Sequence, residues 1–168
     1  MFAMKTFHYP KRSAHALGTS QRQRGVGLIE VLIAVLLLSV AFLGIAALQA
    51  MSLSTNNSAM ARSMATMASY SILDAMRADV AAAKNGSYNT TAPIKASACP
   101  DKGTSMVSTQ QYDWCDMLGK TLGAVDTTTG SINCVGTEGD CTITIQFDDS
   151  RAGKGGERNQ TVVTRAML

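Results

Sequence analysis

Residues 21–38 read QRQRGVGLIEVLIAVLLL, which places a basic segment directly before an apolar one. Between residues 31 and 50 only Ser39 and Gln49 are polar. At ~1.5 Å per residue, about 20 helical residues cross the ~30 Å hydrocarbon core of a bilayer. The stretch therefore predicts a long N-terminal helix that enters a membrane, and it contains one residue that such a helix does not need, the acid Glu30.

The positive charge of the chain is confined to its N-terminal segment. Residues 1–25 carry five Lys or Arg and no acid, whereas the rest carries ten Lys or Arg against twelve Asp or Glu. A basic flank before an apolar helix indicates the cytoplasmic side of a membrane. A nucleic-acid-binding arm is the competing interpretation, but it leaves unexplained why the charges end where the apolar run begins. We therefore expect the cytoplasmic (inner) membrane as a partner, and no nucleic acid.

Three kinds of membrane segment fit this pattern: a cleaved secretory signal, a plain anchor, and a signal that is cut on the cytoplasmic side before the apolar run. Glu30 distinguishes between them, because an ionised carboxylate in an apolar helix is costly unless it is paired. A plain anchor or a secretory signal gains nothing from such an acid. A cut after Gly25 makes Val26 the new N-terminus and Glu30 its fifth residue. The amine of a neighbouring subunit can then pair with Glu30 and favour one stagger between packed helices.

Residues 24–34, RGVGLIEVLIA, resemble the processing motif of type IV prepilins and pseudopilins. The resemblance implies that a prepilin peptidase cuts between Gly25 and Val26 and methylates the Val26 amine, and that Glu30 serves assembly. The family usually has Phe where this chain has Val26, and its major subunits often carry a proline in the apolar helix, which is absent here. These departures favour a minor subunit, and residues 72–88 resemble minor pilins of the pilus-modification (PilV-like) type.

The family resemblance also implies a domain organisation and a location. Residues 1–25 are expected to be a cleaved leader, 26–53 a transmembrane and assembly helix, and 54–168 a periplasmic globular domain. The expected fold is α+β, with the long helix packed against a small antiparallel sheet. The protein would begin in the inner membrane with its C-terminal domain in the periplasm, and then reach the pilus at the cell surface.

The expected function is that of a minor type IV pilin, a structural subunit involved in pilus assembly and priming, motility and attachment. Its partners would be the prepilin peptidase and other minor and major pilins. A minor pseudopilin of type II secretion is an alternative from the same superfamily. A membrane-tethered periplasmic binding module is an alternative from another class.

Helical periodicity continues past the apolar run and predicts that the helix packs on a sheet. The residues expected to form its core stripe, with spacings of three or four, are Met60, Met64, Met67, Ser71 and Ala75, and the stripe is expected to be widened by Ile72, Leu73, Met76 and Val80. Residues 54–58, STNNS, are weak helix formers and predict a bend or frayed turn. The helix is expected to end near Lys84, Asn85 and Gly86, where the glycine can cap it.

The C-terminal half carries the β signals. Alternation of Ile143, Ile145 and Phe147 with polar residues predicts a strand over 141–147, paired in a hairpin with a strand over 131–135. A last strand is predicted over 160–167. A short helix is expected over 111–122, and irregular chain over 88–110, a turn at 148–150 and a charged Gly-rich loop over 151–159.

Four cysteines follow the membrane segment: Cys99, Cys115, Cys134 and Cys141. No C-x-x-C pair is present, which argues against a zinc site, and two disulfides in an oxidising compartment are the better interpretation. Four cysteines allow three pairings. Cys134 and Cys141 flank a Gly-containing turn, so one pairing clips that hairpin and leaves Cys99 with Cys115.

The sequence offers no catalytic constellation. Both histidines, His8 and His15, lie in the basic segment, so the rest of the chain lacks the commonest general base and metal ligand. The stretch GKGGER does not match the P-loop pattern. The adjacent acids Asp148 and Asp149 are ordinary turn formers. We therefore expect no enzyme, no cofactor and no metal.

Overall fold

The computed structural model describes residues 25–136, 138–150 and 156–168, so most of the expected leader and residues 151–155 of the expected Gly-rich loop lie outside the described residues. The elements are α1 (Leu28–Ala78), α2 (Val80–Lys84), β1 (Ile94–Lys95), α3 (Met106–Leu122), β2 (Thr129–Val135), β3 (Asp140–Phe147) and β4 (Gln160–Met167). The α+β prediction is confirmed. The chain divides between Ala41 and Phe42 into two units, and the second holds the sheet.

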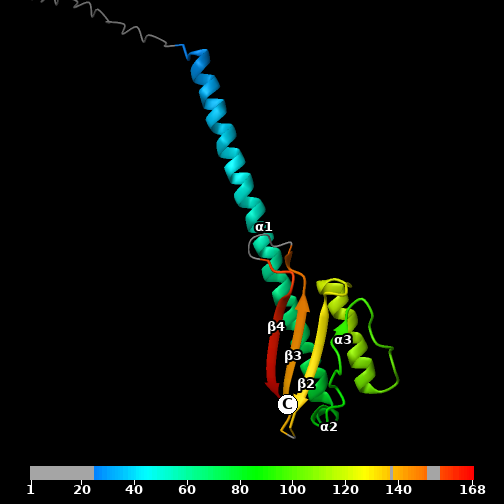
Figure 1. Ribbon diagram of the computed structural model, residues 1–168. Helices are drawn as coiled ribbons and strands as arrows, with labels where there is room; N and C mark the ends of the chain where they lie inside the picture. The colour runs from blue at the N-terminus through cyan, green and yellow to red at the C-terminus, as the bar shows by residue number, and fades with distance from the viewer. Residues whose placement is uncertain (1–24, 137, 151–155) are drawn as a thin grey trace, which may run out of the picture. The chain divides into compact units, whose positions relative to one another are not determined.

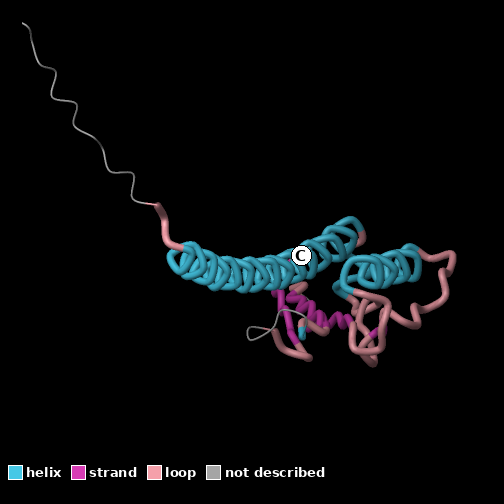
Figure 2. Tube along the Cα trace, turned by 90° about the horizontal axis from the view of Figure 1, so that it is seen from above, coloured by secondary structure: helices cyan, strands magenta, loops and turns pink. Residues whose placement is uncertain are grey.

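The four strands form one antiparallel sheet in the order β1-β2-β3-β4. Figure 1 shows β2, β3 and β4 side by side, and Figure 2 shows the strands on one side of the helices. The predicted hairpin and the predicted last strand are confirmed. Cys134 and Cys141 lie directly opposite each other in the hairpin, and the alternating residues Ile143, Ile145 and Phe147 are buried.

Helix α1 runs without interruption through residues 54–58, so the expected frayed turn is wrong. Helix propensity is a weak preference that neighbouring residues override. Here Ser58 is already buried within the second unit, where its hydroxyl donates to Asp149, and the Thr55 hydroxyl donates to the Met51 carbonyl oxygen at 3.0 Å, inside the helix. Tertiary packing and this internal bond hold the segment helical.

The end of the long helix agrees with the prediction except for one break. Asp79 leaves helical geometry (φ −132°, ψ 58°), and the short α2 then continues to Lys84. Asn85 caps α2, and Gly86 follows with a φ of +81°, a left-handed conformation in which glycine is not strained.

Helix α3 begins five residues earlier than expected. Ser105 is its N-cap, and its hydroxyl oxygen accepts a hydrogen bond from the Ser108 N–H at 3.1 Å. This capping satisfies one of the otherwise free N–H groups at the helix start. The irregular segment is therefore shorter than 88–110, and it also contains the two-residue strand β1.

The predicted core stripe of α1 is confirmed at Ile72, Leu73 and Met76, which are buried, and it is wrong in its first part. Met60, Met67 and Ser71 are exposed and Met64 is only half-buried. In the first part of this face the buried residues are instead Ala65 and Ala68. Small side chains let the neighbouring elements approach the helix backbone closely.

Trp114 of α3 shows how close this approach is. Its side chain is buried, and its indole N–H donates to the backbone carbonyl oxygen of Ala68 at 3.0 Å. On its other side, Trp114 occupies the space above Gly130 of β2, where a Cβ atom would overlap the indole ring. The elements α1, α3 and β2 thus meet at Trp114, the only tryptophan of the chain.

Gly130→Ala is expected to destabilise the second unit by about 1–3 kcal/mol, because the added methyl group forces the well-packed Trp114 and Leu118 to move. The measurement is urea unfolding of the detergent-solubilised protein, followed by circular dichroism. An unchanged unfolding midpoint would show that the indole does not pack on Gly130 as described.

The buried phenol of Tyr88 makes the folding stability of the second unit depend on pH in the alkaline range. Burial raises the pKa of its phenol above the ordinary value of 10.0, and the Asp79 carboxylate raises it further. The folded state therefore favours the neutral phenol, and the stability linked to this group is present below pH 10 and lost as the pH rises above it.

Tyr88→Phe is expected to weaken the alkaline loss of stability. At neutral pH the variant should be up to about 1 kcal/mol more stable, since the buried phenol oxygen has no hydrogen-bond partner among the described residues. Unfolding midpoints on either side of pH 10 test both statements. Tyr70→Phe, at an exposed tyrosine, is the control, and an equal response of the two variants would contradict the prediction.

Candidate functional site

The junction between Gly25 and Val26 lies in non-helical, exposed chain directly before α1. The helix begins where the backbone N–H groups of Glu30 and Val31 both donate to the Gly27 carbonyl oxygen, at 2.9 and 3.3 Å. A Cβ atom built at Gly25 would meet nothing within 4 Å. The peptide bond at which the sequence predicts cleavage therefore lies outside the helix, and the space beside the Gly25 Cα is open among the described residues.

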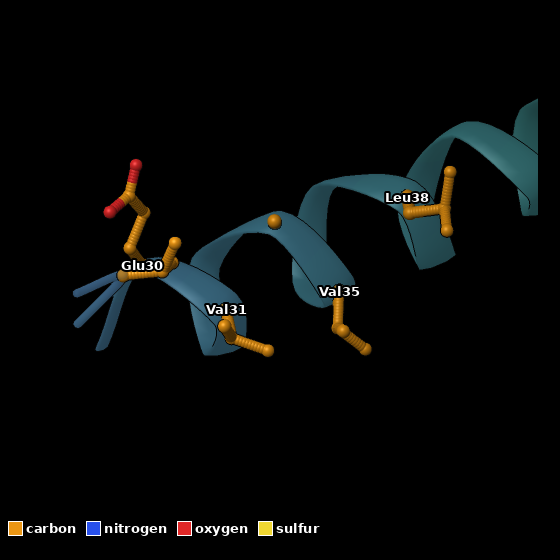
Figure 3. A pocket seen from close by; sticks show the side chains of 6 residues that line it. Glu30, Val31, Val35 and Leu38 are labelled. Carbon is orange, nitrogen blue, oxygen red and sulfur yellow. The ribbon is translucent and has the colours of Figure 1, made fainter. Parts of the chain in front are cut away.

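Glu30 lies in the first turn of α1, where a negative charge is favourable beside the helix N-terminus. Its carboxylate is exposed and accepts no hydrogen bond or ion pair within the described part of the chain. Figure 3 shows the carboxylate directed away from the side of the helix on which Val31 and Val35 lie. Val26 and Glu30 line one shallow surface depression with apolar helix residues. The structure thus brings the predicted new terminus and the acid onto neighbouring surface.

The apolar part of α1 is exposed along its whole length in the described structure, from Leu28 to Leu53. Its most apolar 18-residue window has a mean hydropathy of 3.0, so by length and composition α1 can cross a membrane. The Ser39 hydroxyl donates to the Val35 carbonyl oxygen at 2.7 Å and is satisfied within the helix. Because each large apolar side chain gains about 1.5–3 kcal/mol on burial, this surface fits a bilayer or other apolar helices.

The cysteines form two disulfides in the second unit, Cys99–Cys115 and Cys134–Cys141. This is the pairing that clips the hairpin. No group of three or more metal-ligating side chains occurs within residues 25–136, 138–150 and 156–168.

A buried polar cluster at the edge of the second unit is absent from the sequence-based expectations. Asp149 is only 6% exposed, and its carboxylate accepts a hydrogen bond from the Ser58 hydroxyl of α1 at 2.5 Å. Arg62 lies 4.0 Å from the same carboxylate and donates to the Gln160 side chain at 3.0 Å. The sequence analysis assigned Asp149 to a turn and therefore did not predict that its carboxylate is buried. The alternation that buries Ile145 and Phe147 could have predicted it, because Asp149 is the next residue on the same inner face.

Comparison with known proteins identifies the N-terminal segment. A protein-family model described as the prokaryotic N-terminal methylation motif matches residues 20–46, a range that contains the junction at Gly25 and Val26, the acid Glu30 and the front of the apolar helix. No curated protein and no solved structure matches the chain significantly.

Proposed function

We propose that the chain, whose N-terminal segment matches the prokaryotic N-terminal methylation motif, is a minor type IV pilin that is cut between Gly25 and Val26 and then assembled into a fibre. The observation that carries this proposal is the junction itself. An exposed, non-helical peptide bond precedes an exposed apolar helix, and the fifth residue after that bond is the acid Glu30. Proteins with this motif are structural, so the chain would be the substrate of a peptidase and a component of the fibre.

The proposal assigns a place to each part of the chain. Residues 1–25 are the leader, which stays in the cytoplasm because of its five basic residues. Residues 26–53 cross the inner membrane before assembly, and residues 54–168 form the periplasmic domain. The two disulfides support this location, because disulfides persist in oxidising compartments such as the periplasm.

Assembly requires that the apolar helix leaves the bilayer, and other pilin helices are the surface that can replace the lipid. In such a bundle the Glu30 carboxylate would be desolvated and would need a cation. The methylated amine of Val26 from a neighbouring subunit supplies one, and the resulting ion pair favours one axial stagger. The free carboxylate of Glu30 in the single chain is consistent with a partner on another subunit.

The experiment that tests the proposal is a mass measurement of the N-terminal peptide of the mature protein. We expect N-methyl-Val26. An N-terminus beyond residue 45 would indicate a secretory signal peptide and overturn the proposal, and an uncut chain would favour a tethered binding module. A pseudopilin gives the same N-terminus as a pilin, so purification with pilus or with type II secretion components separates those two.

Glu30→Ala is expected to be cut normally but to enter fibres poorly, because the cut precedes assembly and the pairing belongs to assembly. The measurement compares mutant protein in sheared surface fibres with mutant protein in membranes. Ser39→Ala is the matched control, since that hydroxyl is satisfied inside its own helix. Equal incorporation of the two variants would eliminate the pairing role of Glu30.

A further inference from the structure

Asn85 is the only asparagine of the chain that is followed by a glycine. A glycine in the next position leaves the backbone nitrogen unhindered, because no Cβ atom lies beside it. Asn85 is exposed at the end of α2, so water reaches its side-chain amide. An exposed pair of this kind can cyclise, since the glycine nitrogen lies within reach of the asparagine side chain.

The Asn85 side chain is held against the backbone that follows it. Its Oδ1 atom accepts hydrogen bonds from the Ser87 hydroxyl at 2.5 Å and from the Ser87 N–H at 3.1 Å. Two donors on one carbonyl oxygen polarise the amide and stabilise the negative charge that develops there during attack on its carbon. The Asn85 Nδ2 atom donates no hydrogen bond within the described part of the chain. The amide carbon is therefore activated, and its nitrogen is free to leave.

The attacking group is the backbone nitrogen of Gly86, which also caps α2. The Gly86 N–H donates to the Ala83 carbonyl oxygen at 3.1 Å, and Gly86 has a φ of +81°. The Ser87 N–H donates to the Ala82 carbonyl oxygen at 2.9 Å, which completes a Schellman cap. Attack requires the Gly86 bond to open. Because α2 has five residues and a helix this short has little stability of its own, its last turn opens readily.

We propose that Asn85 is a site of spontaneous modification, at which the side-chain amide becomes a carboxylate with water as the only co-reactant. The Gly86 nitrogen bonds to the Asn85 Cγ atom, the Cγ–Nδ2 bond breaks, and ammonia leaves with the proton of the Gly86 N–H. Water then opens the five-membered imide ring. Opening at Cγ gives aspartate, and opening at the main-chain carbonyl gives isoaspartate, in which the backbone runs through the side chain. No group is oxidised or reduced.

Asn89 lies four residues further along the chain and is protected from the same reaction. Its Nδ2 atom donates to the Cys134 carbonyl oxygen at 3.0 Å, and its Oδ1 atom accepts from the Cys134 N–H at 2.7 Å. Both polar atoms of this amide are thus engaged by β2. The next residue is Thr90, whose β-branched side chain crowds the backbone nitrogen that would attack. The structure therefore makes Asn85 reactive and Asn89 inert.

The modification changes the junction between α2 and the sheet. A carboxylate at Asn85 adds a negative charge at the C-terminal end of a helix, where negative charge is unfavourable. Isoaspartate also adds one backbone atom before Gly86, which displaces the cap. The residues that follow, Asn89 and Thr90, cover the edge of β2 with hydrogen bonds to its backbone. We therefore expect isoaspartate to loosen this edge. A methyltransferase that recognises isoaspartyl carboxylates is the class of enzyme for which the modified chain is a substrate.

Timed incubation of the purified full-length protein in detergent at mildly alkaline pH tests the proposal, because base removes the proton of the attacking nitrogen. Trypsin cuts after Lys84 and Lys95, so both asparagines lie in one peptide, and fragment masses show which amide has become an acid. We expect conversion at Asn85 at least about tenfold faster than at Asn89, which is held by hydrogen bonds and followed by a β-branched residue. Methyl transfer by an added isoaspartate methyltransferase detects isoaspartate, and protein that has not been incubated gives the baseline.

Asn85→Gln is the matched control, because its longer side chain must close a six-membered ring and should form no acid. Conversion at Asn85 that is no faster than at Asn89, or that occurs only in protein unfolded by urea, overturns the proposal. Asn85→Asp adds the charge alone, so it should unfold at a higher urea concentration than the isoaspartate form. Equal midpoints overturn the effect on the β2 edge. These results are independent of the proposed function, because the leader and the apolar helix take no part in the reaction.

Discussion

Gly25→Val is expected to leave essentially all of the protein uncut, so that the chain keeps its 25-residue leader and no Val26 N-terminus forms. A peptidase that acts at this bond must bring its catalytic groups against the backbone, and glycine is the residue that permits such close approach. The effect should lie in processing and not in folding, because a Cβ atom at Gly25 meets nothing within 4 Å. Immunoblots of membranes, which separate precursor from mature protein by size, provide the measurement.

Gly27→Ala is the matched control for this result. It lies two residues away, its added Cβ makes only an ordinary 3.8 Å contact with Ile29, and it follows the proposed bond. We expect it to be cut. Mature protein from Gly25→Val at the wild-type level would place the cut elsewhere and remove the basis of the proposed function.

Ser58→Ala is expected to destabilise the second unit by about 2–3 kcal/mol, because it leaves the buried Asp149 carboxylate without its hydrogen-bond donor. Arg62 compensates little, since it is 4.0 Å away and about half exposed. Urea unfolding of the detergent-solubilised protein, followed by the fluorescence of the buried Trp114, provides the measurement.

Ser69→Ala is the control, because Ser69 is also buried on α1 but donates only to the Ala65 carbonyl oxygen of its own helix, at 3.0 Å. Its loss should change stability by much less. Asp149→Ala in the Ser58→Ala background should recover part of the lost stability, since it removes the unsatisfied charge. Equal effects of the two serine substitutions would show that the Ser58–Asp149 bond contributes little.

The sequence by itself determined the features that depend on local pattern. Periodicity of two is a property of a strand, and it located the inward residues of β3. A run of about 20 apolar residues after a basic segment predicts a helix able to cross a membrane, and the spacing from Gly25 to Glu30 is read directly from the chain. Consequently the fold class, the hairpin and the N-terminal motif could all be predicted.

Only the tertiary structure decided which face of α1 is covered. Alanine and methionine both occur along α1 at helical spacing, so periodicity alone does not tell which of the two faces is buried. Trp114 requires a close approach to the helix backbone, which the small Ala68 permits, and so Ala65 and Ala68 are buried while Met60 and Met67 stay exposed. Asp149 was assigned to a turn for the same kind of reason, because its partner Ser58 lies 91 residues away and no local pattern joins them.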